Sequence, residues 1–229
     1  MKYMASSPRR AFMKYVKAIS RKTKEASILN GMSPELRQMV YCAAIVECSA
    51  SMECYIENVF CSWIQNADKY ADNGAIPFTA RAFIFGKQCE QSVVTYILKN
   101  DDKDFISSMC SADKSYIFDH EKINKAQIIN SAIRDVKYPS VKNIKKLFIR
   151  FGINNIFDLM SEKLRTDSKL LLKSLMDIRC SVVHSYPAAE VFSSEDVHIH
   201  MINSRRIVRS IDSVLHGLII DTSCSNCWP

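Results

Sequence analysis

The spacing of apolar residues along this chain is helical almost throughout. Between residues 34 and 67, apolar side chains recur at intervals of three, four and seven, as on one face of a helix: Leu36, Val40, Ala43, Ala50, Cys54, Cys61 and Ile64. Val46, Ile56 and Val59 lie on other faces, so we expect this helix to be buried on more than one side. No pair of stretches alternates as the strands of a hairpin do.

A second long helix is predicted to begin at residues 193–196, whose Ser-Ser-Glu-Asp sequence is typical of a helix start. Its apolar positions have heptad-like spacing: Val197, Met201, Val208, Ile211, Leu215 and Leu218. Shorter helices are predicted at 86–99, 121–136, 141–151 and 156–163, and from Thr166 or Asp167 to about 184. Ser140, Gly152 and Pro187 mark helix boundaries. The prediction is an all-α bundle with two long helices and several shorter ones.

Much of the positive charge lies near the N-terminus. The formal net charge is +7, and in residues 1–29 Glu25 is the single acid against these basic residues: Lys2, Arg9, Arg10, Lys14, Lys17, Arg21, Lys22 and Lys24. Apolar residues recur there at helical spacing: Phe12, Tyr15, Val16 and Ile19. A basic amphipathic helix can contact RNA or a membrane surface. The alternative is a solvated arm that packs on the body by one apolar stripe.

With 229 residues, 48% of them hydrophobic, the chain is long enough to form one large domain with its own core. We divide it into a basic N-terminal arm or helix (1–29), one helical domain (30–221) and a tail (222–229). Nine scattered cysteines fit reduced thiols in the cytoplasm better than a disulfide framework. We find neither an apolar run of the roughly 20 residues that a membrane helix needs nor a secretion signal. We therefore expect no membrane association.

Cys224 and Cys227 form a CxxC pair near the C-terminus, but no second pair completes a zinc site. A frayed tail is the favoured interpretation, and a metal or redox site is the alternative. No Gly-rich phosphate loop, nucleophile elbow or H-E-x-x-H motif occurs. The sequence therefore predicts neither a metal site nor another cofactor.

Arg179 and His184 are the strongest candidates for chemistry. Arginine is always cationic and histidine titrates near neutral pH, and acid–base cleavage of an anionic ester needs both. Five positions along an ideal helix turn a side chain by about 140° around the axis. The pair therefore converges only if the helix ends or bends near Val183, or if a second copy supplies another pair. The alternative is a salt-bridged arginine and a capping histidine.

Glu53 and Glu57 lie four residues apart on one face of the first long helix. A carboxylate inside a largely apolar helix needs a partner, and either residue can pair with Arg179. Solvent exposure is the alternative for both. Basic residues on the outward face of the 141–151 helix are expected to contact phosphates: Lys142, Lys145, Lys146 and Arg150.

The elements after residue 138 follow a recognisable order. Tyr138-Pro139 precedes a helix at 144–151, Gly152-Ile153, a short helix at 156–160, the R-x4-H stretch at 175–185 and a closing helix at 197–218. This order resembles the HEPN superfamily, and within it the RiboL-PSP or MAE-like type. Residues 46–55 resemble an early helix of the same family, which carries over Glu53.

The resemblance implies a dimeric, metal-independent endoribonuclease, often a toxin or defence effector, that cleaves RNA through attack by its 2′-OH. Arg179 and His184 carry over as catalytic, and Glu53, Cys180, Ser181 and Tyr186 are expected to support them. The dimer would form through the helix that holds the motif, and a cognate antitoxin or other partner protein is a further expectation.

Two positions depart from the family pattern. The usual Asn after the arginine is Cys180 here, and the usual Gly after the histidine is Ser185. Asn donates and accepts hydrogen bonds, whereas Cys does so only weakly. The alternative is therefore a weakly active or inactive HEPN partner or antitoxin that binds protein or RNA.

Overall fold

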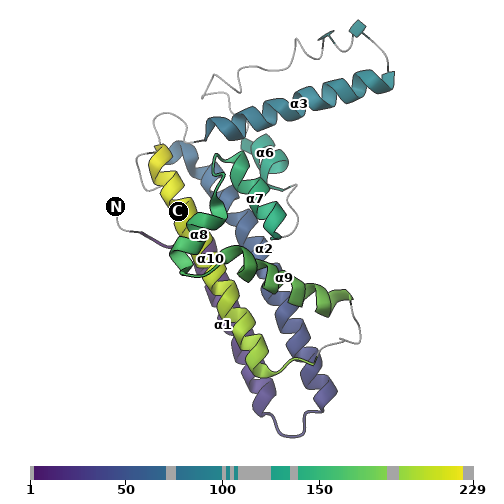
Figure 1. Ribbon diagram of the computed structural model, residues 1–229, viewed down its shortest axis with the longest axis vertical. Helices are drawn as coiled ribbons and strands as arrows, with labels where there is room; N and C mark the ends of the chain where they lie inside the picture. Colours follow the sequence, from purple (N-terminus) through teal and green to yellow (C-terminus); the bar gives the residue numbers. More distant parts are fainter. Residues whose placement is uncertain are drawn as a thin grey trace.

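The structure is a computed structural model that describes residues 3–70, 76–99, 102–103, 106–107, 125–134, 139–184 and 191–223. Within these ranges every regular element is a helix and none is a strand, which confirms the all-α prediction (Figure 1). The two longest helices are α2 (Pro34–Tyr70) and α10 (Ser194–Ser223), as predicted. Both α1 (Ser7–Ile28) and α3 (Phe78–Lys99) have 22 residues.

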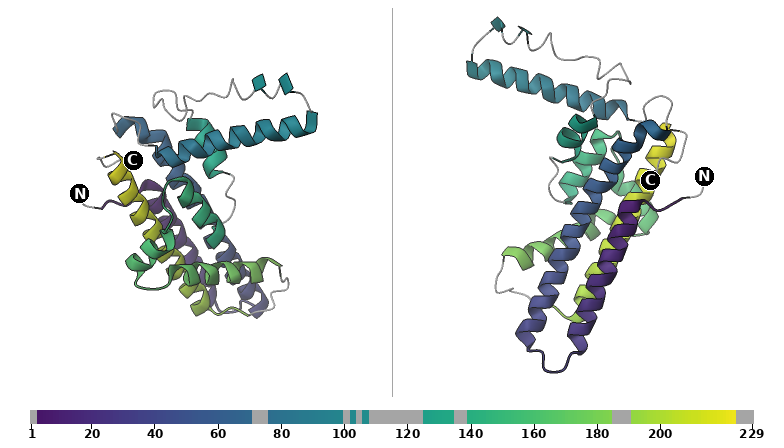
Figure 2. Two further views of the ribbon diagram at one scale, coloured as in Figure 1. Left: turned by 45° about the horizontal axis from the view of Figure 1, so that its top comes forward. Right: turned by 180° about the vertical axis from the view of Figure 1, so that it is seen from behind.

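The bundle is built on α1, α2 and α10, which lie side by side along most of their lengths (Figure 2). The helix α9 (Ser168–His184) crosses this group and packs on α2 and α10. Two short helices, α7 (Val141–Arg150) and α8 (Ile156–Leu164), complete the same side. Near one end lie α6 (Lys125–Ile128) and the π-helical turn η1 (Ile129–Ile133), and α3 projects outward there (Figure 1).

The basic N-terminal segment is one helix of the bundle. Ser6 caps α1, because its Oγ accepts a hydrogen bond from Arg9 N at 3.1 Å. Phe12, Val16 and Ile19 are buried in the same hydrophobic core as α2 and α10. Tyr15 is 47% exposed. Of the two interpretations of this segment, packing by one apolar stripe describes its structure.

Local sequence signals fix most helix ends where they were predicted. Ser140 caps α7 by accepting from Asn143 N at 3.2 Å. Gly152 ends that helix with a φ of 89°, which favours glycine. Asp167 caps α9 by accepting from Lys169 N and Leu170 N. Before α10, Ser193 and Asp196 bond each other's backbone N–H groups, which is a capping box.

The predicted inward face of α2 is wrong in part. Leu36, Ala43, Ala50 and Cys54 are exposed. Several large side chains on different faces of α2 are fully buried instead, among them Ile45, Met52, Phe60, Trp63 and Ile64. Because α1, α9 and α10 all pack on α2, no single stripe describes its buried surface.

One predicted boundary changes, and one predicted helix contains a π turn. Residues 81–85, which the pattern did not assign, belong to a continuous α3. The helix predicted at 121–136 is described only from Lys125 to Arg134, and it widens into η1, where Arg134 N donates to Ile129 O. A π turn has a wider hydrogen-bond spacing than an α-helix, so an apolar pattern with a period of 3.6 residues does not predict it.

By length and composition alone, α2 is long and apolar enough to span a membrane: within Pro34–Asn66, a window of 18 residues has a mean hydropathy of 1.3. The expectation that no stretch is apolar enough is wrong by this measure. A core helix passes the same test, and α2 packs against α1, α9 and α10.

Candidate functional site

The predicted pair of Glu53 and Arg179 lies where α2 and α9 pack together. Leu172, Leu175 and Val182 are buried and hold α9 on the bundle, and Arg179 is partly buried on the flank of α9. Burial raises the pKa of the Glu53 carboxyl, the Arg179 guanidinium acts in the opposite direction, and the Glu57 carboxylate adds to the rise. Glu53 and Arg179 therefore interact electrostatically across the two helices.

Glu57 has a different partner. Arg134 Nε lies 3.0 Å from Glu57 Oε1, so the second carboxylate is paired with the segment that follows η1. Of the two alternatives that the sequence left open for Arg179, the electrostatics favour Glu53.

His184 is exposed and is the last residue of α9. Val183 and His184 both belong to α9, so the geometry of a regular helix applies to Arg179 and His184. Each residue of a helix turns the side chain by about 100° around the axis. His184 therefore lies opposite the buried Leu175, which is nine positions earlier, and about 140° from Arg179, which is five positions earlier. In one chain, Arg179 is partly buried and acts electrostatically on Glu53 of α2, whereas His184 is exposed.

The remaining predicted site residues are dispersed. Cys180 is exposed and Ser181 is partly buried, while Tyr186 lies outside the described residues, as do Cys224 and Cys227. In the described part of the chain, no group of three or more His, Cys, Asp and Glu side chains is placed to hold a metal ion. Every cysteine that the structure describes is a free thiol.

The predicted phosphate contacts divide into two kinds. Lys142, Lys145 and Lys146 are exposed on α7. Arg150 is partly buried: its Nη1 donates to Ala132 O at 2.7 Å and its guanidinium stacks on the Phe83 ring at 4.3 Å from the centroid. Arg150 therefore ties α7 to η1 and α3, and the lysines present the positive charge of α7 to solvent.

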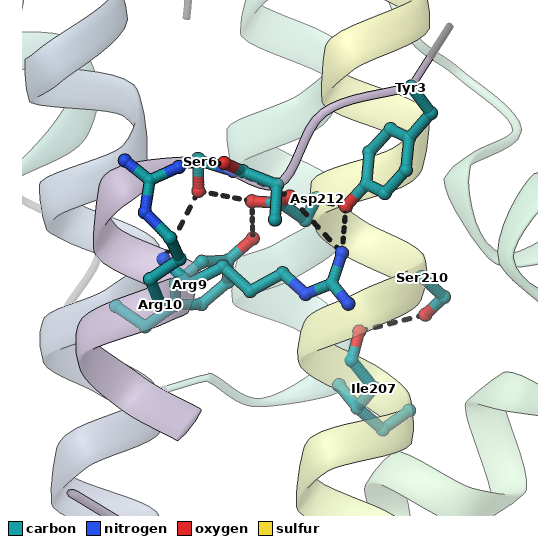
Figure 3. Close-up of polar contacts among 9 residues, drawn as sticks. Tyr3, Ser6, Arg9, Arg10, Ile207, Ser210 and Asp212 are labelled. Atoms are coloured by element: carbon teal, nitrogen blue, oxygen red, sulfur yellow. Dashed lines mark hydrogen bonds and ion pairs between the residues drawn. The ribbon is translucent and has the colours of Figure 1, made fainter. Parts of the chain in front are cut away.

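Sequence reasoning missed a buried polar cluster around Asp212, which is fully buried in α10 (Figure 3). Its carboxylate accepts from Tyr3 Oη at 2.6 Å, Tyr55 Oη at 3.1 Å, Ser6 N at 3.2 Å and Ser6 Oγ. The guanidinium of Arg9 lies 3.8 Å away. This cluster joins the start of the chain to α2 and α10.

His200 is a second buried polar residue that sequence reasoning missed. It is 1% exposed, its Nε2 lies 3.5 Å from Ser49 Oγ, and burial lowers the pKa of its imidazole to about 4. The periodicity contained the signal: His200 follows Val197 by three residues, and Asp212 follows Val208 by four. Both therefore lie on the apolar stripe of α10, where a polar residue is expected to be buried.

No protein-family model matches this chain, and no similar protein was found among curated proteins or solved structures.

Proposed function

We propose that this chain is an HEPN-type, metal-independent endoribonuclease of the toxin or defence class that acts in the cytoplasm as a homodimer. The observation that carries the proposal is the R-x4-H pair on α9, with Arg179 acting electrostatically on Glu53 and His184 exposed at the end of the helix. The order of helices around the motif supports it, since an all-α bundle is the architecture that the resemblance implies.

The reaction needs little from the protein because RNA supplies its own nucleophile. The 2′-OH attacks the adjacent phosphorus and the P–O5′ bond breaks, which yields a 2′,3′-cyclic phosphate and a 5′-OH. A histidine takes the 2′-OH proton or returns one to the leaving oxygen. Arg179 stabilises the charge on the phosphorane. Glu53 acts through Arg179 and is a positioning residue.

The geometry of α9 supports the proposal of a dimer. The reaction needs a general acid and a general base, and the motif of one chain holds a single histidine, His184. Because Arg179 and His184 point about 140° apart, an isologous pair of chains would have to bring the two arginines and two histidines to one axis. Val183 is 43% exposed and can contact the second copy, whereas Val182, also expected at that interface, is 8% exposed in its own chain.

The test is incubation of purified protein with single-stranded RNA. We expect cleavage in the presence of EDTA, products ending in a 2′,3′-cyclic phosphate, and no cleavage of RNA that is methylated at the 2′-oxygen. His184→Ala should lower the rate by about 10²–10⁴-fold, and the matched control His198→Ala, an exposed histidine of α10, should not. Cleavage of the blocked RNA, or loss of cleavage in EDTA, contradicts the mechanism.

A mixture of Arg179→Ala and His184→Ala chains tests the dimer. If the two pairs work across the axis, the mixed dimers recover activity that neither variant has alone. A fully active monomer in sedimentation at the assay concentration contradicts this arrangement.

RNA binding should depend on the basic surface of α7. Replacing Lys142, Lys145 and Lys146 by Gln should weaken binding and reduce its salt dependence. For single-stranded RNA, the log–log slope should fall by about 0.7 for each phosphate that the variant no longer neutralises. Affinity that does not change with salt contradicts RNA as the partner.

The second candidate is an inactive HEPN partner or antitoxin, and Cys180 favours it. Cys180 is exposed one residue after Arg179, at the position where the family pattern has Asn. The variant Cys180→Asn separates the two functions. A rise in cleavage rate indicates an enzyme with a weakened site, whereas RNA or protein binding without cleavage in both forms indicates a binding module.

A further inference from the structure

The helix α1 presents one straight row of basic side chains to solvent. At about 100° per residue, five exposed residues fall within an arc of about 80°: Arg10, Lys14, Lys17, Arg21 and Lys24. The buried stripe of the same helix is centred about 160° away, at Phe12, Val16, Ile19, Thr23 and Ala26. The basic row is therefore the outermost face of α1. It is about 21 Å long, with a cation roughly every 5 Å.

The row keeps most of its positive charge. In the described part of the chain, the ammonium groups of Lys14, Lys17 and Lys24 make no hydrogen bond or ion pair. Glu25 is the one acid of α1, and its carboxylate lies 3.5 Å from Arg21. Both side chains of that pair are mostly exposed, so water screens it and it neutralises little of the row.

The surroundings of the row favour a nucleic-acid backbone over a membrane or a protein. An amphipathic helix binds a membrane by inserting its apolar face, and Phe12, Val16 and Ile19 are buried in the core instead. A protein interface is anchored by apolar or aromatic side chains near its centre, whereas the arc from Arg10 to Lys24 holds basic residues alone. Phosphates need no such anchor, and they repeat once per nucleotide.

We propose that the basic row of α1 binds the phosphate backbone of single-stranded RNA, as a surface separate from the R-x4-H pair. Among the described helices, α1 packs on α2 and α10 and contacts neither α9 nor α7 (Figure 2). A flexible strand can follow a straight helix, whereas the phosphates of a duplex wind away from it. The row therefore holds a long RNA that is cleaved at α9. The proposal rests on the proposed function for the choice of RNA as the polyanion.

Two triple variants test the row, each made in His184→Ala protein so that the RNA stays intact. The row variant is Lys14→Gln with Lys17→Gln and Lys24→Gln. The control removes the same charge from exposed residues outside the row: Lys22→Gln with Lys163→Gln and Arg209→Gln. The comparison therefore separates the position of the charges from the net charge.

The measurement is the affinity for labelled poly(U) as a function of salt concentration. The row variant should lower the log–log salt slope by about 2, at about 0.7 for each lost phosphate contact, and the affinity at about 0.1 M salt by about 100-fold. The control should keep the slope of the parent protein. Circular dichroism checks that all proteins are folded. Equal slopes in the two variants overturn the proposal, because binding then follows net charge alone.

Vesicles that contain phosphatidylserine are the second probe. The row variant and the control should bind them equally. A protein that binds these vesicles through the row and does not bind poly(U) would have a membrane surface at α1, which also overturns the proposal.

Cleavage of a trinucleotide by the wild type separates this proposal from the proposed function, because so short an RNA does not reach from α9 to α1 across α2 and α10. If the trinucleotide is cut and the two variants bind poly(U) equally, the nuclease stands and the row is not its RNA-binding surface. If poly(U) binds through the row and no RNA is cut, the row stands and the nuclease does not.

Discussion

Two polar clusters of this protein differ in burial and in hydrogen bonding. Asp212 is fully buried, and its carboxylate accepts four hydrogen bonds from Tyr3, Ser6 and Tyr55 (Figure 3). Glu53 and Arg179 are only partly buried between α2 and α9, and His184 beyond them is exposed. The first cluster is saturated by its own chain, and the second presents charged and titratable groups to solvent.

The difference separates groups that maintain the fold from groups placed to meet a ligand. A buried carboxylate that is fully hydrogen-bonded fixes the segments that contact it, and removing it leaves several partners unsatisfied. An exposed histidine contributes little to stability and keeps its nitrogens accessible. The clusters should therefore respond to mutation in opposite ways, in stability at Asp212 and in activity at His184.

Asp212→Ala should cause the largest loss of stability. It leaves Arg9, Ser6 and Tyr55 without their common acceptor, so we expect the free energy of unfolding to fall by about 3–5 kcal/mol. Chemical denaturation measures the loss. Asp221→Ala, an exposed acid of the same helix, is the control and should change stability by less than about 0.5 kcal/mol. Equal losses in the two variants would mean that Asp212 does not hold the segments together.

Acidification should have the next largest effect, through His200. Its pKa is about 4 in the folded protein and 6.5 in an exposed ring, so below pH 6.5 the unfolded chain binds a proton that the folded chain does not. Stability is therefore lost as pH falls from about 6.5 to 4, by about 3 kcal/mol from this group, and the loss levels off below pH 4.

The contribution of His200 is isolated by comparison with His200→Phe. Chemical denaturation at several pH values should give a shallower pH dependence for this variant than for the wild type, while His198→Asn should match the wild type. Parallel pH profiles for wild type and His200→Phe would place the titration at other groups.

Tyr55→Phe should cost less than either change. It removes one donor to the Asp212 carboxylate and leaves three hydrogen bonds and the Arg9 charge in place. We expect a loss of about 1 kcal/mol in the free energy of unfolding. Tyr15→Phe is the control because Tyr15 is exposed, with its hydroxyl 3.4 Å from Glu47. A loss as large as that of Asp212→Ala would indicate that the cluster acts as one cooperative unit.

His184→Ala should have the smallest effect on stability, within about 0.5 kcal/mol, because its side chain is exposed at the end of α9. The same variant is expected to lose most of the proposed nuclease activity. Parallel denaturation and RNA cleavage assays measure the two effects. Strong destabilisation would mean that any loss of activity reflects unfolding.

Helix type and helix ends were predictable because their causes are local. Ser140, Asp167 and the Ser193–Asp196 pair cap helices that begin where the sequence places them. Gly152 ends α7 with a positive φ. Each of these signals acts within three or four residues, so no knowledge of the tertiary structure is needed to interpret it.

Burial on α2 was harder to predict, because it depends on which helices surround it. Cys54 lies at the expected spacing but is exposed, whereas Met52 and Trp63 are fully buried. The spacing describes one face, and α1, α9 and α10 cover several. Glu53 illustrates the same limit. From the sequence, its carboxylate could either pair with Arg179 or face solvent, and the packing of α9 on α2 places it within the electrostatic influence of the arginine.

The sequence by itself determined that this chain is helical, where most helices begin and end, and that Arg179 and His184 diverge around a regular helix, since these follow from contacts within one turn. Only the tertiary structure decided that α1 belongs to the core, that the Asp212 carboxylate accepts hydrogen bonds from Tyr3, Ser6 and Tyr55, and that His200 is buried beside Ser49 of α2. These features join residues far apart in the chain, and which side chains meet there depends on how the helices pack together.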